Sequence, residues 1–310
     1  MSYQEYRCCF NCGSNDFKTK YKFRRGYFDS KKYVTHSWDG GLNLELSIVK
    51  CKKCKTVFQN PCINESALKY FYPEDIIPNK LPKEILKDNS KFKFLIEDVL
   101  LTKYPFKKDI TVIDVGARYG LLSFFLKQLG FECYSLEMNK KCIEAANSIG
   151  INNIYPGTID DLKKILPSLN IDRVNVFTLC DLIEHLIDPS LDFEVLSSFQ
   201  FKGDRIILTT PNFNSLGRYF FGKNWYYIHG QHTNYFDSKS VEKFANNNGY
   251  IVEQIHKVKF YKNIFKIFPN LVKYLKFKFS FLSLNSDQKL WFAKYRPHFF
   301  DTMIVVLKKI

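Results

Sequence analysis

The sequence predicts an α/β fold in which a doubly wound, mostly parallel sheet carries a small zinc ribbon at its amino-terminal side. Between residues 106 and 255, strands rich in β-branched residues alternate with helices, a pattern typical of parallel sheets. Two CxxC pairs lie within the first 62 residues. The chain has 310 residues and 45% hydrophobic residues, which is enough for both units.

The zinc ribbon is expected over residues 1–62. Its four candidate ligands are Cys9, Cys12, Cys51 and Cys54, which stand in "CFNCGS" and "VKCKKCKTVFQNP". Four thiolates at this spacing are typical of a closed, tetrahedral structural zinc site, in which the metal replaces the core that so short a segment lacks. Cys8 is an alternative to Cys9, because the sequence does not show which of two adjacent thiols points inward.

Residues 63–105 are expected to form a linker and leading helices, because "KFKFLIEDVLLTKY" has apolar residues at helical spacing. The main domain follows over residues 106–255, and glycines end its helices. Strands are expected at 110–115, 131–136, 174–181 and 205–212, and helices at 120–129, 139–150 and 238–250. Residues 291–310 are expected to supply the final strand, at "TMIVVLKK".

The chain is basic, with a formal net charge of +15. Such a charge is compatible with a nucleic acid, an anionic glycan or a membrane surface as partner. The abundance of Lys, Asn, Ile, Phe and Tyr is equally typical of an AT-rich genome, which adds solvated lysines without any anionic partner. No signal-peptide-like apolar stretch opens the sequence, so a cytoplasmic protein is expected, with a position at the inner face of the membrane as an option.

Residues 256–290 have the pattern of basic amphipathic helices. Between residues 256 and 286 there are seven lysines and no acidic residue, and Pro269 interrupts the apolar spacing. This segment could lie on an anionic membrane. It could also be a lid that packs its apolar face on the main domain.

The stretch "VIDVGARYG", residues 112–120, has the form of a nucleotide-binding strand and loop. Arg118 stands where the GxGxxG pattern of dinucleotide sites needs a glycine, so that pattern fails. An acidic residue before GxGxG fits at Asp114, Gly116 and Gly120. Glu137 ends the next strand, 21 residues after Gly116, where a carboxylate can accept both hydroxyls of a ribose. A nucleoside with a cationic amino-acid tail, S-adenosylmethionine (SAM), therefore fits better than a dinucleotide.

With "FTLCDLIEHLIDP" and the pair of Trp225 and "GQHTNYFDSKSVEKFANNNGY", these motifs extend over residues 8–250. Together they resemble class I SAM-dependent methyltransferases, and more narrowly the bacterial enzymes with an amino-terminal zinc ribbon that act in sugar or surface-polysaccharide pathways. The resemblance implies a Rossmann-like, seven-stranded methyltransferase fold. It implies SAM and a structural Zn²⁺ as cofactors.

The resemblance also implies roles for single residues in cofactor binding. Gly116 and Gly120 would let the backbone approach SAM, Asp114 would lie near its methionine end, and Glu137 would take the ribose hydroxyls. "PGTIDDL" would place Ile159 or Asp160 beside the adenine. The expected cofactor-binding residues are Asp114, Gly116, Ala117, Arg118, Gly120, Glu137, Met138, Ile159 and Asp160. Arg118 at positive φ would cost on the order of 1 kcal/mol, so the loop either turns differently or keeps the arginine for a contact.

Three residues are candidates for the chemistry at the acceptor: His232, His185 and Asp181. A histidine is largely neutral near pH 7 and can take a proton from an acceptor hydroxyl. Asp181 could orient that hydroxyl or cap the strand end, and His185 with Glu184 could shape the loop instead. Trp225, Tyr226 and Tyr227 could stack on a sugar or pack in the core. The remaining histidines are expected at surface or packing positions: His36, His229, His256 and His298.

The leading hypothesis is O-methylation of a sugar, as nucleotide sugar or surface glycan, with SAM as methyl donor. One alternative is a zinc-ribbon protein that binds or methylates RNA, because lysines and aromatic residues interleave in residues 17–34 and 256–286. The other alternative is a catalytically silent relative whose Arg118 loop no longer takes a cofactor.

Overall fold

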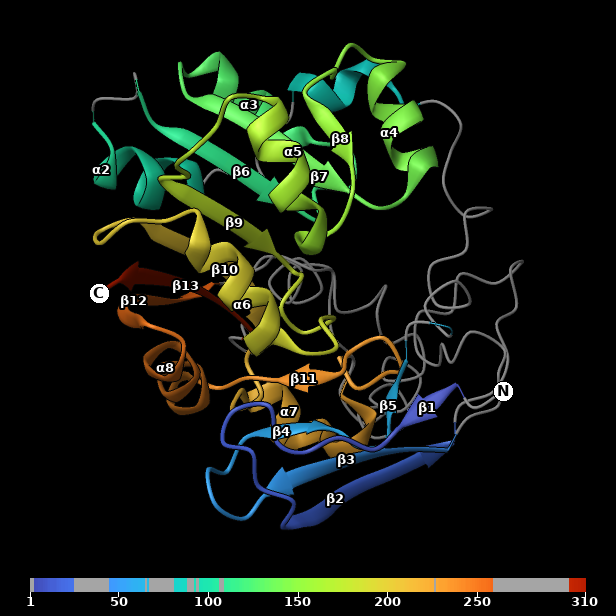
Figure 1. Cartoon of the computed structure of the whole chain (residues 1–310). Helices are drawn as coiled ribbons and strands as arrows, with labels where there is room; N and C mark the ends of the chain where they lie inside the picture. The colour runs from blue at the N-terminus through green and yellow to red at the C-terminus, as the bar shows by residue number, and fades with distance from the viewer. Residues whose placement is uncertain are drawn as a thin grey trace, which may run out of the picture.

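A seven-stranded, mostly parallel sheet forms the centre of the molecule (Figure 1). The computed structural model describes residues 3–24, 45–64, 66, 81–87, 92, 95–105, 109–225, 227–258 and 301–310. The order of the strands is β12-β13-β10-β9-β6-β7-β8. Their bounds are β6 Thr111–Val115, β7 Glu132–Glu137, β8 Ile154–Pro156, β9 Val176–Cys180, β10 Arg205–Pro211, β12 Tyr250–Val258 and β13 Thr302–Lys309.

Five strands of this sheet, from β10 to β8, run parallel, and β13 runs antiparallel between β10 and β12. Strands β6 and β9 lie side by side although two βα units separate them in sequence, so the strand order reverses at this point. Ligands of open α/β sheets bind at such a switch point, beyond the carboxyl ends of the strands. The predicted Rossmann-like, doubly wound fold is therefore confirmed.

Helices cover both faces of the sheet. On one face, α5 (Leu162–Ser168), α6 (Pro189–Ser198) and α8 (Ser238–Asn247) pack through residues such as Phe193 and Phe244, both fully buried. On the other face lie α3 (Leu121–Gln128), the π-helical turn η3 (Leu95–Leu100) and α2 (Leu101–Lys103). The edge beside β8 is covered by α4 (Lys140–Asn147) and the short helix η2 (Lys83–Lys87).

Asp or Asn side chains cap the amino-terminal ends of several of these helices. The Asn139 side chain accepts backbone N–H bonds at the start of α4, and Asp188 does the same for α6, where Pro189 occupies the first helical position. Asp237 and Ser240 form a reciprocal capping box on α8. Each cap satisfies N–H groups that have no partner within the helix, a contribution of about 1 kcal/mol.

The N-terminal module, defined here as residues 3–24 and 45–64, contains β1 (Gln4–Glu5), β2 (Phe17–Arg24), β3 (Glu45–Cys51), β4 (Val57–Gln59) and β5 (Cys62–Ile63). Its main sheet has the order β11-β4-β3-β2. The strand β11 is Asn234–Tyr235, which comes from the far end of the methyltransferase-like domain and pairs with Phe58 and Val57. The module therefore shares a sheet with the domain it was expected to precede.

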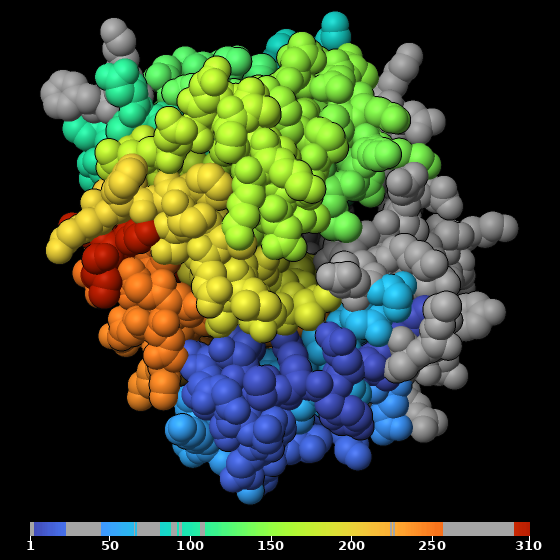
Figure 2. All heavy atoms as spheres, viewed as in Figure 1, coloured from blue at the N-terminus to red at the C-terminus, as the bar shows by residue number. Residues whose placement is uncertain are grey.

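The N-terminal module also shares a hydrophobic core with that domain. Figure 2 shows the blue amino-terminal residues directly against the yellow part of the chain. The core joins three residues of the module to four of the domain, namely Leu46, Ile48 and Val57 with Phe213, Trp225, Ile228 and Tyr235. Trp225 is only 1% exposed, so of its two expected roles, stacking on a sugar or packing in the core, the indole has the second.

Of the basic segment predicted at residues 256–290, only residues 256–258, the end of β12, are among the described residues, and the rest lies outside them. The same holds for most of the linker between residues 63 and 94. The domain limits given above stay predictions. Within the described ranges, no helix has the length and apolar character needed to cross a membrane.

Candidate active site

The loop after β6 has a left-handed backbone at three alternate positions. Gly116, Arg118 and Gly120 have φ values of 69°, 56° and 63°. A Cβ at Gly116 would lie 3.0 Å from Leu182, and one at Gly120 would lie 3.2 Å from Ile151, so both glycines are required by space as well as by φ. Arg118 has the same left-handed backbone conformation as the two glycines on either side of it.

The strain at Arg118 is offset by a hydrogen bond to Glu137, at the end of β7. The Arg118 N–H donates to Glu137 Oε2 over 2.7 Å, and the Asn139 N–H donates to Oε1 over 2.8 Å. Burial raises the pKa of Glu137, a carboxyl group that is 9% exposed. The carboxylate is thus fixed in position, and each of its oxygens keeps one further acceptor site.

The segment expected beside the adenine lies next to Glu137. The Gly157 N–H donates to the Glu137 carbonyl over 3.1 Å and so joins the end of β7 to the loop after β8. Ile159 is buried at the start of η4 (Ile159–Asp161), whereas Asp160 is exposed and Met138 is 51% exposed. Met138 is therefore open to a ligand, and Ile159 contributes to the floor of the loop.

Asp114 is buried within the sheet at the end of β6. Its Oδ1 accepts a hydrogen bond from the Thr178 hydroxyl of β9 over 2.7 Å, and the side chain is 3% exposed. This bond locks the two switch-point strands together. Ala117 follows the loop glycine, and its N–H donates to the Leu136 carbonyl of β7 over 3.0 Å.

Asp181 stands at the carboxyl end of β9, exposed and with a φ of 53°. The Thr209 hydroxyl of β10 donates to Asp181 Oδ1 over 2.7 Å. Three residues later, Glu184 is 2% exposed. Burial, and after it the Asp181 carboxylate, raises the pKa of Glu184 well above its usual range.

Three histidines gather beside Glu184. The rings of His185 and His232 are 4.6 Å apart between centroids and nearly perpendicular, and the His229 ring lies 3.9 Å from that of His232. Tyr227 stacks on His232 at 6.0 Å with an interplanar angle of 13°. The candidate bases therefore lie together, and His229, which was expected at a surface or packing position, lies against His232.

The two loops that carry these histidines are hydrogen bonded to each other. The Thr233 and Asn234 N–H groups donate to the Glu184 carbonyl over 2.8 and 3.1 Å. His185 Nδ1 lies 3.1 Å from the Gln231 carbonyl, where the ring fits as a donor. Burial lowers the pKa of His185 to about 4, so the ring is neutral near pH 7.

Arg7 of the N-terminal module connects both loops, a role that sequence reasoning missed. Its guanidinium donates to the carbonyls of Ile187 and Thr233 and to Asn234 Oδ1, the last two over 2.9 and 3.0 Å. The side chain also lies over the Phe58 ring at 5.2 Å. Nothing in "EYRCCF" marks this arginine apart from its proximity to Cys9.

The Cys cluster, Cys9, Cys12, Cys51 and Cys54, brings its four sulfur atoms within 4.8 Å of one another. The Cys9–Cys54 and Cys12–Cys51 sulfur pairs are 3.4 and 3.6 Å apart, close to the roughly 3.8 Å between thiolates in tetrahedral zinc sites. Cys9 is buried and Cys8 is exposed, so Cys9 is the thiol that points inward. The donor set and its geometry fit a structural zinc ion.

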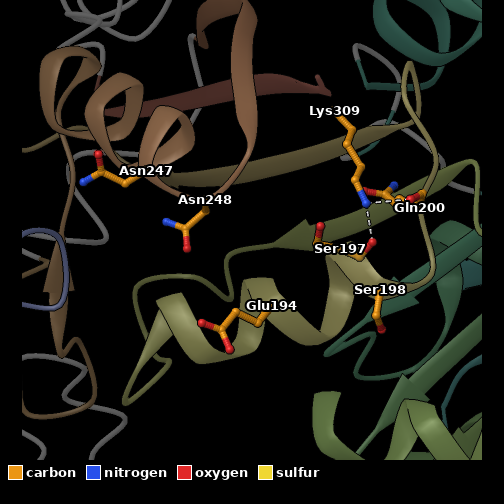
Figure 3. Close-up of a pocket in the computed structure, with 7 residues that line it drawn as sticks. All are labelled: Glu194, Ser197, Ser198, Gln200, Asn247, Asn248 and Lys309. Carbon is orange, nitrogen blue, oxygen red and sulfur yellow. Dashed lines mark hydrogen bonds between the residues drawn. The ribbon is translucent and has the colours of Figure 1, made fainter.

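The pocket in Figure 3 lies away from this site. It has a volume of about 560 Å³ and lies between α6 and α8, lined by Glu194, Ser197, Ser198, Gln200, Asn247, Asn248 and Lys309. Lys309 caps the end of α6 by donating to the carbonyls of Ser197 and Gln200. This region is at the amino end of β10, opposite the edge that carries Glu137 and Asp181, so it does not serve the predicted chemistry.

Comparison with known proteins agrees with this geometry. A family model described as a methyltransferase domain matches residues 89–255. The chain belongs to this family. This class I SAM-dependent methyltransferase has Arg118 between the two glycines of the loop after β6. The sequence matches none of the curated proteins.

Solved methyltransferase structures share the fold at low sequence identity. One is a Haloferax volcanii complex between the Trm112 methyltransferase activator and a candidate methyltransferase, with 14% identity, a TM-score of 0.50, and coverage of 73% of this chain and 93% of that chain. A SAM-dependent methyltransferase from Archaeoglobus fulgidus has 17% identity and a TM-score of 0.46, and the match covers 73% of this chain and 97% of that chain. A SAM-dependent methyltransferase from Mesorhizobium loti has 13% identity and a TM-score of 0.47, and the match covers 72% of this chain and 100% of that chain.

Proposed function

We propose that this SAM-dependent methyltransferase methylates a hydroxyl oxygen of a sugar, carried as a nucleotide sugar or as part of a surface glycan. The observation that carries the proposal is the cluster of Glu184, His185 and His232 beside the carboxyl end of β9. A polar cluster that includes two imidazoles suits a hydroxyl acceptor, which must lose its proton during transfer. The motif resemblance to zinc-ribbon sugar methyltransferases supports the sugar.

The residues of the cofactor loop fit SAM. The Glu137 carboxylate is held by two backbone N–H groups and keeps acceptor sites for a ribose diol. Gly116 and Gly120 have no side chains, so within this loop only Ala117, Arg118 and Tyr119 contribute side-chain atoms. The Arg118 N–H turns toward Glu137, so its contribution to the loop comes from the backbone and is independent of the guanidinium.

When bound, SAM supplies a methyl carbon whose C–S bond breaks as the new C–O bond forms, leaving S-adenosylhomocysteine. In the simplest form of the reaction, His232 takes the hydroxyl proton, and Asp181 orients the hydroxyl from the end of β9. His185, with a pKa of about 4, is a weak base, so its role is to hold the acceptor oxygen or its neighbour. Tyr227 and His229 fix the His232 ring by contact.

The test is methyl transfer from SAM to a panel of nucleotide sugars, with a tRNA and total RNA as competing acceptors. We expect turnover on a sugar that falls at least 100-fold in His232→Gln and is unchanged in His256→Gln, a substitution on the edge strand β12. Unchanged S-adenosylhomocysteine binding in His232→Gln would show that only the acceptor step is affected. Methyl incorporation into RNA alone would refute the sugar proposal.

A further inference from the structure

The cluster at the end of β9 has the composition and spacing of a cation site. Glu184, His185 and His232 each offer one ligand atom, and these atoms lie within 4.8 Å of one another. Two imidazoles and one carboxylate are a donor set that catalytic Zn²⁺ and related divalent metals use, with a position left open for water or substrate. Bonds of about 2.1 Å at tetrahedral angles separate such ligands by about 3.4 Å, which small side-chain rotations reach.

A second, independent observation is the state of the Glu184 carboxyl group. Glu184 is 2% exposed, and its Oε2 has no partner of hydrogen-bond geometry among the described residues, although the Thr210 hydroxyl lies near the carboxyl group. A buried oxygen without a hydrogen-bond partner destabilises the fold, and more so when it is charged. A bound cation would remove this cost, because the oxygen would become a ligand.

The surroundings of His185 are those of a metal-bound imidazole. Its Nδ1 lies 3.1 Å from the Gln231 carbonyl, and a ring that donates there presents Nε2 to the cluster. Metal-ligating histidines commonly donate their second nitrogen to a backbone carbonyl in this way. The Glu184 carbonyl, bonded by Thr233 and Asn234, holds the two ligand-bearing loops in register.

The geometry points to a divalent transition-metal site formed by Glu184, His185 and His232, distinct from the Cys cluster. Its hard and borderline ligands select Zn²⁺, Mn²⁺, Fe²⁺ or Co²⁺ over Ca²⁺. Among the described residues, Asp181, His229, Tyr227 and Tyr235 are further ionisable groups beside it. Asp181 is exposed, and its charge acts on Glu184 and His185. It therefore lies on the side of the site that is open to solvent.

This site deepens the proposed function, and its role in turnover rests on that function. With a cation bound, His185 and His232 would be ligands, so Asp181 would replace His232 as the proton acceptor, and the cation would polarise the acceptor hydroxyl. The hydroxyl proton then passes to the Asp181 carboxylate and on to water, as the oxygen takes the methyl carbon. Metal binding itself needs neither SAM nor acceptor, so it can be measured separately.

The experiment is a Co²⁺ titration of the full chain after its Cys cluster has been filled with Zn²⁺. We expect one equivalent of Co²⁺ to bind with weak d–d absorption and without the intense thiolate-to-metal bands of a cysteine site. Glu184→Gln and His232→Gln should each weaken this binding at least tenfold. Glu194→Gln, on the exposed side of α6, and His256→Gln should leave it unchanged.

Two results would overturn the site: no Co²⁺ binding beyond the Cys cluster, or binding that Glu184→Gln and His232→Gln both leave intact. Should one variant fail to fold, the other and the wild-type spectrum still decide. If Co²⁺ binds as expected but no sugar is methylated, the site stands and the proposed acceptor fails. If a sugar is methylated at full rate without any bound metal at this cluster, the acceptor stands and the cation site fails.

Discussion

The backbone N–H of Arg118 donates to Oε2 of Glu137 over 2.7 Å, which joins the cofactor loop to the end of the neighbouring strand. This bond explains why a non-glycine residue is accepted at a φ of 56°. Glu137 therefore holds the loop, and its proposed second role is to accept the ribose hydroxyls. Substitution of Glu137 tests both roles together.

Glu137→Ala is expected to weaken S-adenosylhomocysteine binding at least tenfold, because both the ribose acceptor and the loop anchor are lost. Calorimetric titration measures the affinity, with NAD as the ligand that should not bind. Glu132→Ala on the same strand, at an exposed position, is the matched control. Unchanged affinity in Glu137→Ala would remove the ribose role.

Arg118→Gly is expected to keep S-adenosylhomocysteine affinity within threefold. The hydrogen bond to Glu137 comes from the backbone, and glycine adopts positive φ without the cost of roughly 1 kcal/mol that a side chain brings. The guanidinium itself lies over Tyr119 at 5.0 Å, on the loop. A tenfold loss of affinity would mean instead that the guanidinium contacts the cofactor.

Cys51→Ser is expected to lower the zinc content of the purified protein by one equivalent and to expose the N-terminal module to proteolysis. A structural zinc site contributes folding free energy directly, and Cys51 is a buried member of the Cys cluster. Elemental analysis and limited proteolysis measure the two effects. Cys8→Ser, at the exposed neighbouring thiol, should match the wild type.

Arg7→Met is expected to raise the KM for the acceptor while leaving S-adenosylhomocysteine affinity unchanged. The substitution keeps an unbranched apolar stem against Phe58 and removes the bonds to Ile187, Thr233 and Asn234 that hold the acceptor loops. Lys52→Met, which removes only an exposed ion pair with Asp16 in the same module, is the control. Equal losses in both variants would point to the module's stability and away from loop positioning.

The ion pair between Arg205 and Glu253 predicts a pH dependence of stability. Hydrogen bonds from Arg205, over 2.8 and 3.1 Å, lower the pKa of Glu253 from 4.5 to about 2. A depressed carboxyl pKa stabilises the fold above pH 4.5, and this contribution, about 2–3 kcal/mol, is lost as the pH falls toward 2. Urea unfolding between pH 2 and 6 should therefore show a shallower pH dependence in Glu253→Gln than in Glu194→Gln.

The periodicity of the sequence was sufficient to predict most of the main sheet. Strands such as β6 and β9 are continuous apolar runs, and glycines end their neighbouring helices, so local signals determine them. The strand β11 has two residues and no such signal, and it exists because β4 offers a partner. Its sheet could only be found in three dimensions.

The candidate site divides in the same way. Glu137 and the loop glycines follow from their distance along one strand–loop–strand unit, which a linear pattern records. The surroundings of His232 do not follow from such a pattern, because Glu184 approaches it, and Arg7 bonds the adjacent Thr233, from distant segments. "HGQH" does contain a signal for His229, since histidines three residues apart can share one side of a turn. Sequence reasoning set that residue aside, although its ring lies 3.9 Å from His232.

The pairing of β4 with β11 has a consequence for synthesis on the ribosome. The N-terminal module leaves the ribosome long before Asn234 and Tyr235 have been translated, so the edge of β4 has no partner while the intervening βα units are made. An exposed strand edge is a template for aggregation. Metal binding by the Cys cluster would hold this edge in a small rigid unit until β11 has been translated. The loop that carries His232 would take its place beside His185 only after the last third of the chain has been synthesised.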